Sequence, residues 1–358
     1  MKDRSVTIRD VAAAAGVSTA TVSRTLDPES AGGVSEKTRL RVVTAVTNIG
    51  YRLNLAARSL KTRSTRTVAI IAPELANNFF MDLAESIEKE LSAQGYTLLV
   101  ASSENSVEEE KKRVTLLADR MVDGMLVIPA GSQGDHLSPS RTGGIPVVLI
   151  DRLVEGTKLD AVVSDNEAGA RALTKKLLED GFSRIAFVGG DKNISTADER
   201  ISGFKAAMGE AGIQVNKNLL RLKGMKTDDG FAHMDAILKS DKPPEAMVAV
   251  NLLVHLGMEL CILARLPHKQ RSYLPVIAAF DQSDYSPFLP ACRYTAAQDA
   301  AAIGKAAARL ILERIGQRKK RDEGARESVP QKDSIQTEIT EPQIIRFPVM
   351  IMRHFQNR

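Results

Sequence analysis

The stretch Val6–Leu26, VTIRDVAAAAGVSTATVSRTL, constrains the fold of this 358-residue chain more than any other part of it. Thr7 stands where a cap residue precedes a first short helix. Asp10 follows three residues later, where its carboxylate can return to the backbone amide of the cap. Gly16 stands where that helix must end, because the sharp turn needs a left-handed backbone that glycine adopts at little cost. A second helix follows at once, and the spacing predicts a helix-turn-helix.

The second helix, Thr19–Leu26, is capped by Ser18 and has the outer face expected of a DNA-reading helix. Its outward side chains are small, polar or cationic, so they can approach base edges and phosphates. Arg24 is the candidate for pairing with a guanine, and the methyl group of Ala20 suits contact with thymine. The candidate DNA contacts in this stretch are Thr7, Ser18, Thr19, Ala20, Thr21, Ser23 and Arg24.

A third helix is predicted over Glu36–Ile49, with Ser35 as its cap and Gly50 at its end. Its apolar residues at helical spacing form the expected inward stripe: Leu40, Val43, Val46 and Ile49. Tyr51 can pack beneath this helix while its hydroxyl reaches toward a phosphate. Three short helices give a minimal core, so we expect an all-α head over residues 1–53.

The basic surplus of the chain is confined to the segment that holds the predicted reading helix. Residues 1–66 carry 12 Lys/Arg against 5 Asp/Glu, a net charge of +7, whereas the remainder carries 37 against 39, a net charge of −2. A basic face is often only a solubility device, but this distribution favours a polyanionic partner.

No run of apolar residues approaches the 18 that a membrane span needs, and the start MKDRSVTIRD lacks an apolar signal segment. We therefore expect a cytoplasmic protein that does not contact a membrane. Cys261 and Cys292 are isolated, with no His at ligand spacing. They are predicted to be buried thiols, and neither a metal site nor a cofactor is expected.

Three stretches carry a resemblance to a known family: VTIRDVAAAAGVSTATVSRTL, VSEKTRLRV and IGYRLNLAARSLK. Residues 5–60 resemble the head of the lactose/galactose repressor family of bacterial transcription regulators, and a looser resemblance runs over almost the whole chain. The resemblance implies that the protein regulates transcription by binding an operator.

The segment Asn54–Lys61, NLAARSLK, is too short to form a stable helix alone in water, and on its residues it is an ordinary linker helix. The resemblance implies more: a hinge helix that orders on the operator and, with its dimer mate, enters the minor groove. Leu60 matches the leucine that the family wedges into the central base step, with Ala57 and Lys61 flanking it. The polar stretch TRSTRT completes a hinge and linker over 54–67.

From Val68 onward, apolar runs alternate with helical patterns, which predicts α/β sheets with helices on both faces. Eight or more strands suggest two sheets. The resemblance implies that residues 68–358 form a core similar to periplasmic sugar-binding proteins, with two lobes on either side of a cleft. The effector is expected to bind in this cleft, and the core is also expected to form the dimer. The expected strands are 68–73, 96–102, 124–130, 146–152, 161–166, 184–190, 246–251 and 275–281; the helices are roughly 79–94, 106–121, 166–180, 198–211, 228–240 and 251–265.

Near the end, a helix is predicted from Asp299 to about Ile315. Residues 316–341 include QRKKRDEGARES and show little apolar periodicity, so a mobile, exposed insertion is expected. Its basic cluster is more typical of a solvated loop than of a DNA contact. Residues 344–355, IIRFPVMIMRHF, are predicted to form a final strand pair.

Ligands of open α/β lobes collect at the carboxyl ends of strands, and polar residues follow several of the expected strands here. Each of them alone is more often a helix cap or a turn former. Together, carboxylates, amides and an arginine suit a polyol, since each hydroxyl both donates and accepts. The residues are Asp151, Arg152, Asp165, Asn166, Asn251, Asp281 and Gln298 at strand ends, and Arg200 near the start of a helix.

The resemblance implies ligand contacts at Asp151, Arg200, Asn251, Asp281 and Gln298, with aromatic packing near Phe79 and Phe80. Leu252 stands where the family commonly has an aspartate. These side chains suit a sugar, a sugar acid or a sugar phosphate, and the sequence does not distinguish among them.

Two other classes of protein compete with this interpretation. An enzyme is disfavoured because no GxGxxG, GxxxxGK[ST] or GxSxG motif is present. A solute-binding protein would fit the core but not the basic head. A single head buries too little surface for specific binding, so we predict a homodimer on a pseudo-palindromic operator. The expected function is repression of carbohydrate-utilisation genes, relieved by the effector; an effector that acts as corepressor is the open alternative.

Overall fold

The computed structural model describes residues 6–26, 33–51, 64–266, 275–327 and 342–354. The chain forms two compact units, Met1–Thr65 and Arg66–Arg358, which are described separately here. None of the helices within the described ranges has the length and apolar character that crossing a membrane requires.

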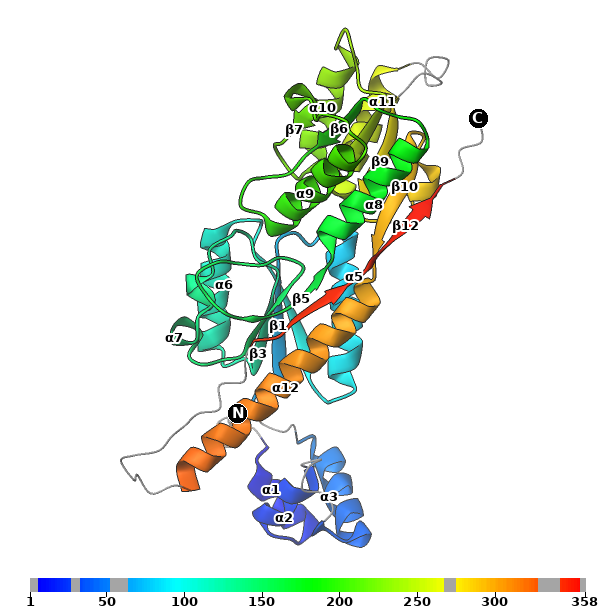
Figure 1. The fold of residues 1–358 in the computed structure, drawn as a ribbon. Coiled ribbons are helices and arrows are strands. Elements are labelled where there is room, and N and C mark those ends of the chain that lie inside the picture. The colour runs from blue at the N-terminus through cyan, green and yellow to red at the C-terminus, as the bar shows by residue number, and fades with distance from the viewer. Residues whose placement is uncertain (1–5, 27–32, 52–63, 267–274, 328–341, 355–358) are drawn as a thin grey trace, which may run out of the picture. The chain divides into compact units, whose positions relative to one another are not determined.

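The first unit is a three-helix head built from α1 (Ile8–Ala15), α2 (Thr19–Leu26) and α3 (Glu36–Ile49) (Figure 1). The predicted caps are present: the Thr7 amide donates to Asp10 Oδ2 (2.8 Å), and the Thr21 amide donates to Ser18 Oγ (3.1 Å). Gly16 and Gly50 end their helices in the left-handed conformation. The small core of the head consists of Val11, Ala12, Ala15, Val22, Val42 and Ala45, with Tyr51 packed against it.

The inward stripe predicted for α3 is wrong in its first half. Leu40 and Val43 are 69% and 47% exposed, whereas Val42 and Ala45 are buried. Steps of three residues drift around a helix with 3.6 residues per turn, so a stripe read at that spacing alone leaves the buried face after one turn.

The second unit contains two α/β lobes with the same strand order, seen as two layered bodies in Figure 1. The first sheet has the order β11-β5-β4-β3-β1-β2 and the second β12-β10-β9-β8-β6-β7. Neighbouring strands are parallel except β10 and β12. The first lobe has β1 (Thr67–Ala72), α5 (Asn78–Ser92), β2 (Thr97–Ser102), α6 (Val107–Asp119), β3 (Gly124–Val127), α7 (Pro139–Thr142), β4 (Val147–Ile150), β5 (Asp160–Ser164), α12 (Ala300–Glu327) and β11 (Ile344–Phe347).

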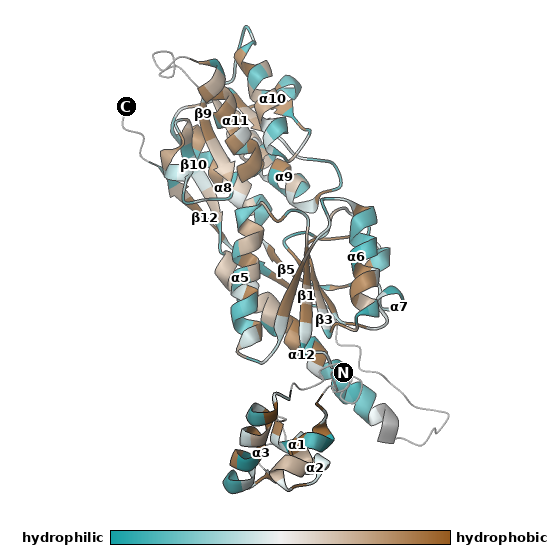
Figure 2. Cartoon of the chain, turned by 180° about the vertical axis from the view of Figure 1, so that it is seen from behind, coloured by the Kyte–Doolittle hydropathy of each residue, from teal (hydrophilic) through white to brown (hydrophobic). Residues whose placement is uncertain are grey.

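The second lobe packs its helices in pairs, α8 with α9 and α10 with α11, around one apolar core. Figure 2 shows the strands of both sheets as hydrophobic and the outer helix faces as hydrophilic, as expected for buried parallel sheets. The elements of the second lobe are α8 (Asn166–Glu179), β6 (Ile185–Val188), α9 (Ser195–Glu210), β7 (Leu220–Arg221), α10 (Thr227–Leu238), β8 (Ala246–Ala249), α11 (Leu252–Arg265), β9 (Val276–Phe280), β10 (Cys292–Gln298) and β12 (Val349–Arg353).

The eight expected strands and the six expected helices are present, but the C-terminal region differs from the prediction. Residues 344–353 do not form a strand pair: β11 joins β5 in the first sheet and β12 joins β10 in the second, with Pro348 between them. The chain therefore passes between the lobes three times, at Asp165, Asp299 and Pro348.

The loop expected from residue 316 is also wrong over its first part, because α12 continues to Glu327. Residues 317–323, QRKKRDE, are good helix formers or tolerate the helix, and Arg314 anchors the preceding turn through two hydrogen bonds to Asp160 (2.7 and 2.8 Å). After Arg314 the apolar periodicity ends because the helix no longer packs on the core, although the helix itself continues. Residues 328–341 lie outside the described ranges.

Candidate DNA-binding face and effector site

The reading helix α2 presents the side chains that the sequence places outward. Thr19, Ala20 and Arg24 are exposed, while Thr21 and Ser23 are half-buried. Val22 is fully buried on the opposite side of the helix. This arrangement leaves a small, polar face with one guanidinium, which suits a DNA groove.

Three other predicted DNA contacts have structural duties in the head. Thr7 Oγ1 donates to Asp10 Oδ2 (2.7 Å), and Ser18 Oγ lies 2.9 Å from Thr21 Oγ1, so both hydroxyls belong to helix caps. Tyr51 is half-buried against the core of the head. The predicted hinge contacts Asn54, Ala57, Leu60 and Lys61 lie outside the described residues.

Arg41 is a residue of the head that the sequence reasoning missed. Its guanidinium reaches from α3 and donates to the carbonyl oxygens of Ala15 and Gly16, the latter at 3.2 Å. These carbonyls end α1, so Arg41 fixes the turn that orients α2. A cation in the middle of a helix carries no local signal for this role.

In the core, Asp151 and Asp281 occupy corresponding places in the two lobes. Asp151 directly follows β4, and Asp281 directly follows β9, the matching strand of the second sheet. Both are buried, and both have positive φ, +65° and +67°, a conformation that aspartate tolerates better than most residues. The two carboxyl groups interact electrostatically, which places them near each other where the lobes meet.

Asp151 interacts electrostatically with two arginines and yet is held partly toward its neutral form. Burial raises its pKa from 3.8 to about 6, against the opposing effects of Arg200 and Arg152. Its Oδ2 lies 3.8 Å from Arg152 Nε. Its Oδ1 has no hydrogen-bond partner among the described residues, and the same is true of Arg152 Nε and of Gln298 Oε1.

Arg200, on α9, is held rigidly. Its side chain is 3% exposed, its Nε donates to Asn166 Oδ1 (2.8 Å) and its Nη1 donates to the Val250 carbonyl (2.8 Å). Its guanidinium stacks on the ring of Phe280, 4.0 Å from the ring centroid. Two hydrogen bonds and an aromatic face fix the direction of the group.

Asp281 has one polar partner beside it, since Gln298 Nε2 donates to Asp281 Oδ1 at 2.6 Å. We call Asp151, Arg152, Arg200, Asp281 and Gln298 the interlobe cluster. Next to the cluster, a hydrogen bond joins the two lobes: the Leu153 amide donates to Ser195 Oγ (2.8 Å).

Two other predicted effector contacts, Asn251 and Asp165, make hydrogen bonds within the second lobe. Asn251 caps α11 through the Val254 amide (2.9 Å) and donates to the Met225 carbonyl (3.0 Å). Asp165 caps α8 through the Ala168 amide (3.1 Å). Both residues therefore already serve as helix caps.

Phe79 and Phe80 begin α5 and are buried with their ring centroids 5.7 Å apart. The Phe80 ring lies 6.0 Å from the Arg152 guanidinium, which brings an aromatic surface to the cluster. Arg152 also donates to Asn105 Oδ1 (3.1 Å) and to the Pro129 carbonyl (3.0 Å).

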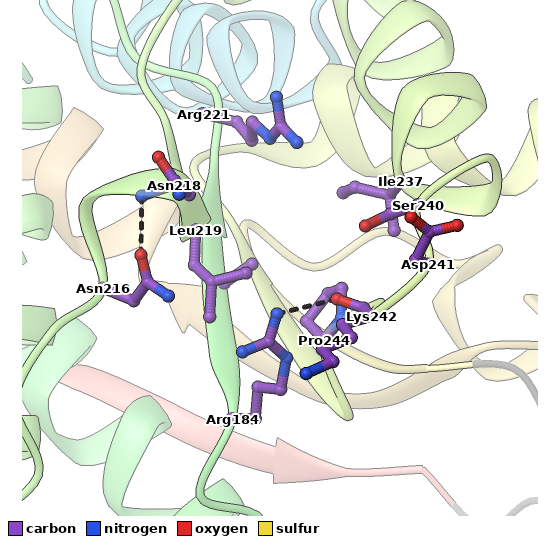
Figure 3. Close-up of a pocket in the computed structure, with 11 residues that line it drawn as sticks. Arg184, Asn216, Asn218, Leu219, Arg221, Ile237, Ser240, Asp241, Lys242 and Pro244 are labelled. Atoms are coloured by element: carbon purple, nitrogen blue, oxygen red, sulfur yellow. Dashed lines mark hydrogen bonds between the residues drawn. The ribbon is translucent and has the colours of Figure 1, made fainter.

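A separate pocket of about 340 Å³ lies beside β7 and the loop after α10 (Figure 3). Arg184 and Leu219 line it, and Arg184 donates to the Lys242 carbonyl (2.7 Å). Since Arg184 directly precedes β6, the pocket lies at the amino end of that strand, whereas parallel sheets gather ligands at the carboxyl ends. This pocket therefore lies away from the strand ends that carry Asp151 and Asp281.

Comparison with known protein families finds one match over the head and one over the core. A model of bacterial regulatory proteins of the lacI family matches residues 7–54. A model of periplasmic binding proteins and the sugar binding domain of the LacI family matches residues 65–336. The chain belongs to the LacI family.

Relatives that match most of the chain support this family assignment. The HTH-type transcriptional repressor PurR of Vibrio atlanticus (strain LGP32) is 31% identical over 312 residues, covering 86% of this chain and 92% of the relative. The solved complex of the transcriptional regulator CelR with cellobiose is 26% identical, with a TM-score of 0.65 over 97% of this chain and 98% of that one. The lac repressor dimer bound to operator and the anti-inducer ONPF is similar in fold, with a TM-score of 0.78 at 22% identity over 98% of both chains.

Within this LacI-family core, sequence reasoning missed Asn105, which follows β2 and supports Arg152. It stands at the carboxyl end of a strand, so the rule that found Asp151 and Asp281 would have found it as well. Asn166, which that rule did find, begins α8 and supports Arg200.

Proposed function

We propose that this protein is a homodimeric repressor of carbohydrate-utilisation genes, released from its operator by a sugar-type effector bound at the interlobe cluster. The head reads a pseudo-palindromic operator through α2, with Arg24 on a guanine and Thr19 and Ala20 at neighbouring bases. It works in the cytoplasm, where its DNA is, and it is a binding protein without enzymatic activity.

The observation that carries the effector site is the unsatisfied hydrogen bonding of the interlobe cluster. Asp151 Oδ1 and Gln298 Oε1 are buried acceptors and Arg152 Nε is a buried donor, none with a partner among the described residues. Leaving such groups unpaired costs free energy, which a ligand that both donates and accepts recovers. A polyhydroxylated sugar is such a ligand, and a carboxylate or phosphate on it would find Arg152 and Arg200 nearby.

The coupling follows from which lobe supplies each group. Asp151 and Arg152 belong to the first lobe, and Arg200 and Asp281 to the second, so a ligand held by both sets favours one angle between the lobes. The chain passes between the lobes three times, which allows them to move as two bodies. In the dimer, that change separates the two hinge segments, the hinge helices lose their mutual packing and the Leu60 wedge leaves the minor groove.

A thermal-shift screen against sugars, sugar acids and sugar phosphates tests this proposal. A ligand present at 100 times its dissociation constant stabilises the protein by about 2.7 kcal/mol. The hit is then added to a gel-shift assay on a duplex that the protein selects from a random-sequence library. Release of the duplex supports induction, and tighter binding would make the effector a corepressor. A protein that selects no duplex would contradict the proposal, and so would one that no compound in the screen stabilises.

A further inference from the structure

The carboxyl end of α12 lies at the edge of the first lobe where the chain from the head enters. The helix runs past the amino ends of the strands: Arg314 holds Asp160, the first residue of β5, and Gly124, the first residue of β3, lies under Ile311. A Cβ at Gly124 would come within 2.8 Å of Ile311 Cγ1, so helix and strand approach closely there.

The next turn of α12 reaches the starts of β1 and β2 through one aromatic ring. Lys319 Nζ donates to the Tyr96 hydroxyl (3.3 Å), and the Arg66 guanidinium lies 5.0 Å from the centroid of the same ring. Tyr96 directly precedes β2, and Arg66 directly precedes β1. Arg66 is also the first residue of the second unit, so the segment that leads to the head leaves the core beside α12.

Beyond this contact the helix continues without a core to cover. Eight more residues after Lys319, from Lys320 to Glu327, extend it by about 12 Å at 1.5 Å per residue. Figure 1 shows this part of α12 reaching past the sheet, and the coloured residues of this part in Figure 2 are mainly hydrophilic. A helix that projects so far from its own lobe gains nothing in core packing, which points to a surface role.

The projecting part carries a cluster of cations. Arg318, Lys319, Lys320 and Arg321 are consecutive, followed by Asp322 and Glu323, which leaves a net charge of +2 over six residues. Asp322 pairs with Arg318 at 3.9 Å. Lys320 and Arg321 are exposed, and across the described part of the chain neither has an ion-pair partner.

We infer that Lys320 and Arg321 form a second DNA-contacting surface, in which the end of α12 binds phosphates of the operator duplex held by the heads. This inference rests on the proposed operator binding. The contact is to the backbone and so adds affinity and salt dependence without reading sequence. The partner is DNA because residues 67–358 carry a net charge of −2, whereas Arg318 to Arg321 are four consecutive cations, and Lys319 shares the Tyr96 ring with Arg66, the first residue after the DNA-binding head.

The test compares Lys320→Gln/Arg321→Gln with a matched control, Lys305→Gln/Arg309→Gln. The control removes the same two charges from the same helix nearer its start, where both side chains face Glu90 and are 50% and 68% exposed. Gln keeps good helix propensity, so both variants should keep the melting temperature of the parent within a few degrees. Each is titrated with the library-selected duplex at several potassium chloride concentrations.

The Lys320/Arg321 variant should bind the duplex on the order of tenfold more weakly at low salt. The slope of log K against log [salt] should become shallower by about 0.9 for each lost phosphate contact, thus by roughly 2 to 4 in a dimer. The base preferences at every operator position should be unchanged, and the control should match the parent protein.

An equal slope in the variant and the parent would overturn the inference, as would an equal loss in the control. A change in the monomer–dimer equilibrium by sedimentation, with the slope unchanged, would assign the surface to a second copy of the chain and overturn it too. Failure of the parent protein to select any duplex would instead overturn the proposed function, so the two failures are distinguishable.

Discussion

The DNA-binding head and the interlobe cluster use their functional side chains in opposite ways. In the head, Arg24 and Thr19 are exposed and the fold rests on other residues, such as Val22 and Val42. In the core, Arg200 and Asp281 are buried, and Arg200 also holds Asn166 and Val250 in place. Function and stability should therefore separate on mutation in the head and remain linked in the core.

The largest expected effect is that of Arg200→Ala. The substitution leaves Asn166 Oδ1 and the Val250 carbonyl without their charged donor and uncovers the Phe280 ring. We expect a loss of about 2–4 kcal/mol in the free energy of unfolding, measured by urea denaturation, together with loss of the effector response. A fully stable variant would show that Arg200 has no structural role in the core and acts like an exposed head residue.

Arg24→Ala should behave in the opposite way. Operator binding should weaken by about 1–3 kcal/mol, with relaxed preference at one base pair of each half-site, while the unfolding free energy stays within about 0.5 kcal/mol. The measurement is a titration against the selected duplex and its single-base variants. An equal loss on all duplexes would make Arg24 a phosphate contact and not a base contact.

Asp151→Asn tests the cost of the buried carboxyl group through pH. Because burial raises its pKa from 3.8 to about 6, the folded protein keeps a proton that the unfolded chain releases over this range. The group therefore favours folding most below pH 4, and that contribution is lost as the pH rises through 6. Asn has no such loss, so the variant should gain about 2 kcal/mol relative to the parent between pH 4 and pH 7.5.

The difference in unfolding free energy between Asp151→Asn and the parent, followed from pH 4 to pH 8, is the measurement. A difference that does not change with pH would mean that this carboxyl has its ordinary pKa in the folded protein. The site would then be more open to solvent than the comparison requires.

Leu60→Ala should have the smallest effect and should act on DNA alone. We expect nearly unchanged thermal stability of the free protein, operator binding weaker by about 1 kcal/mol and reduced bending of the duplex in a circular-permutation gel assay. A large drop in melting temperature with normal bending would place Leu60 in the protein core.

The same contrast explains what could be predicted from the sequence. The head depends on local signals, such as Thr7 with Asp10 or Gly16 at the turn, and these predicted its three helices and its outer face. Its failures are non-local: Leu40 is exposed because α3 packs through Val42 and Ala45, and Arg41 acts across the head on the end of α1.

In the core, apolar runs predicted eight strands of the two sheets but neither β10 nor the two-residue β7, and they did not predict the separate destinations of β11 and β12. The strand-end rule found Asp151 and Asp281. Asn251 and Asp165 are helix caps that bind the amide three residues on, which is the more common local role of such residues. The rule gave no means to see that Arg200 is locked by Asn166, because that contact joins residues far apart in the chain. The length of α12 was missed because periodicity ends where the helix leaves the core.

The most direct test of the central claim measures operator affinity with and without the effector identified by thermal shift, in the parent protein and in Asp281→Asn. Asn at position 281 can still accept the Gln298 hydrogen bond, so the variant should fold and bind the operator as the parent does. Saturating effector should weaken operator binding of the parent by about 1–3 kcal/mol, that is 5- to 150-fold, and leave the variant unaffected. A variant that loses operator binding without effector, while folded and dimeric, would contradict the account, as would a variant that responds fully to the effector.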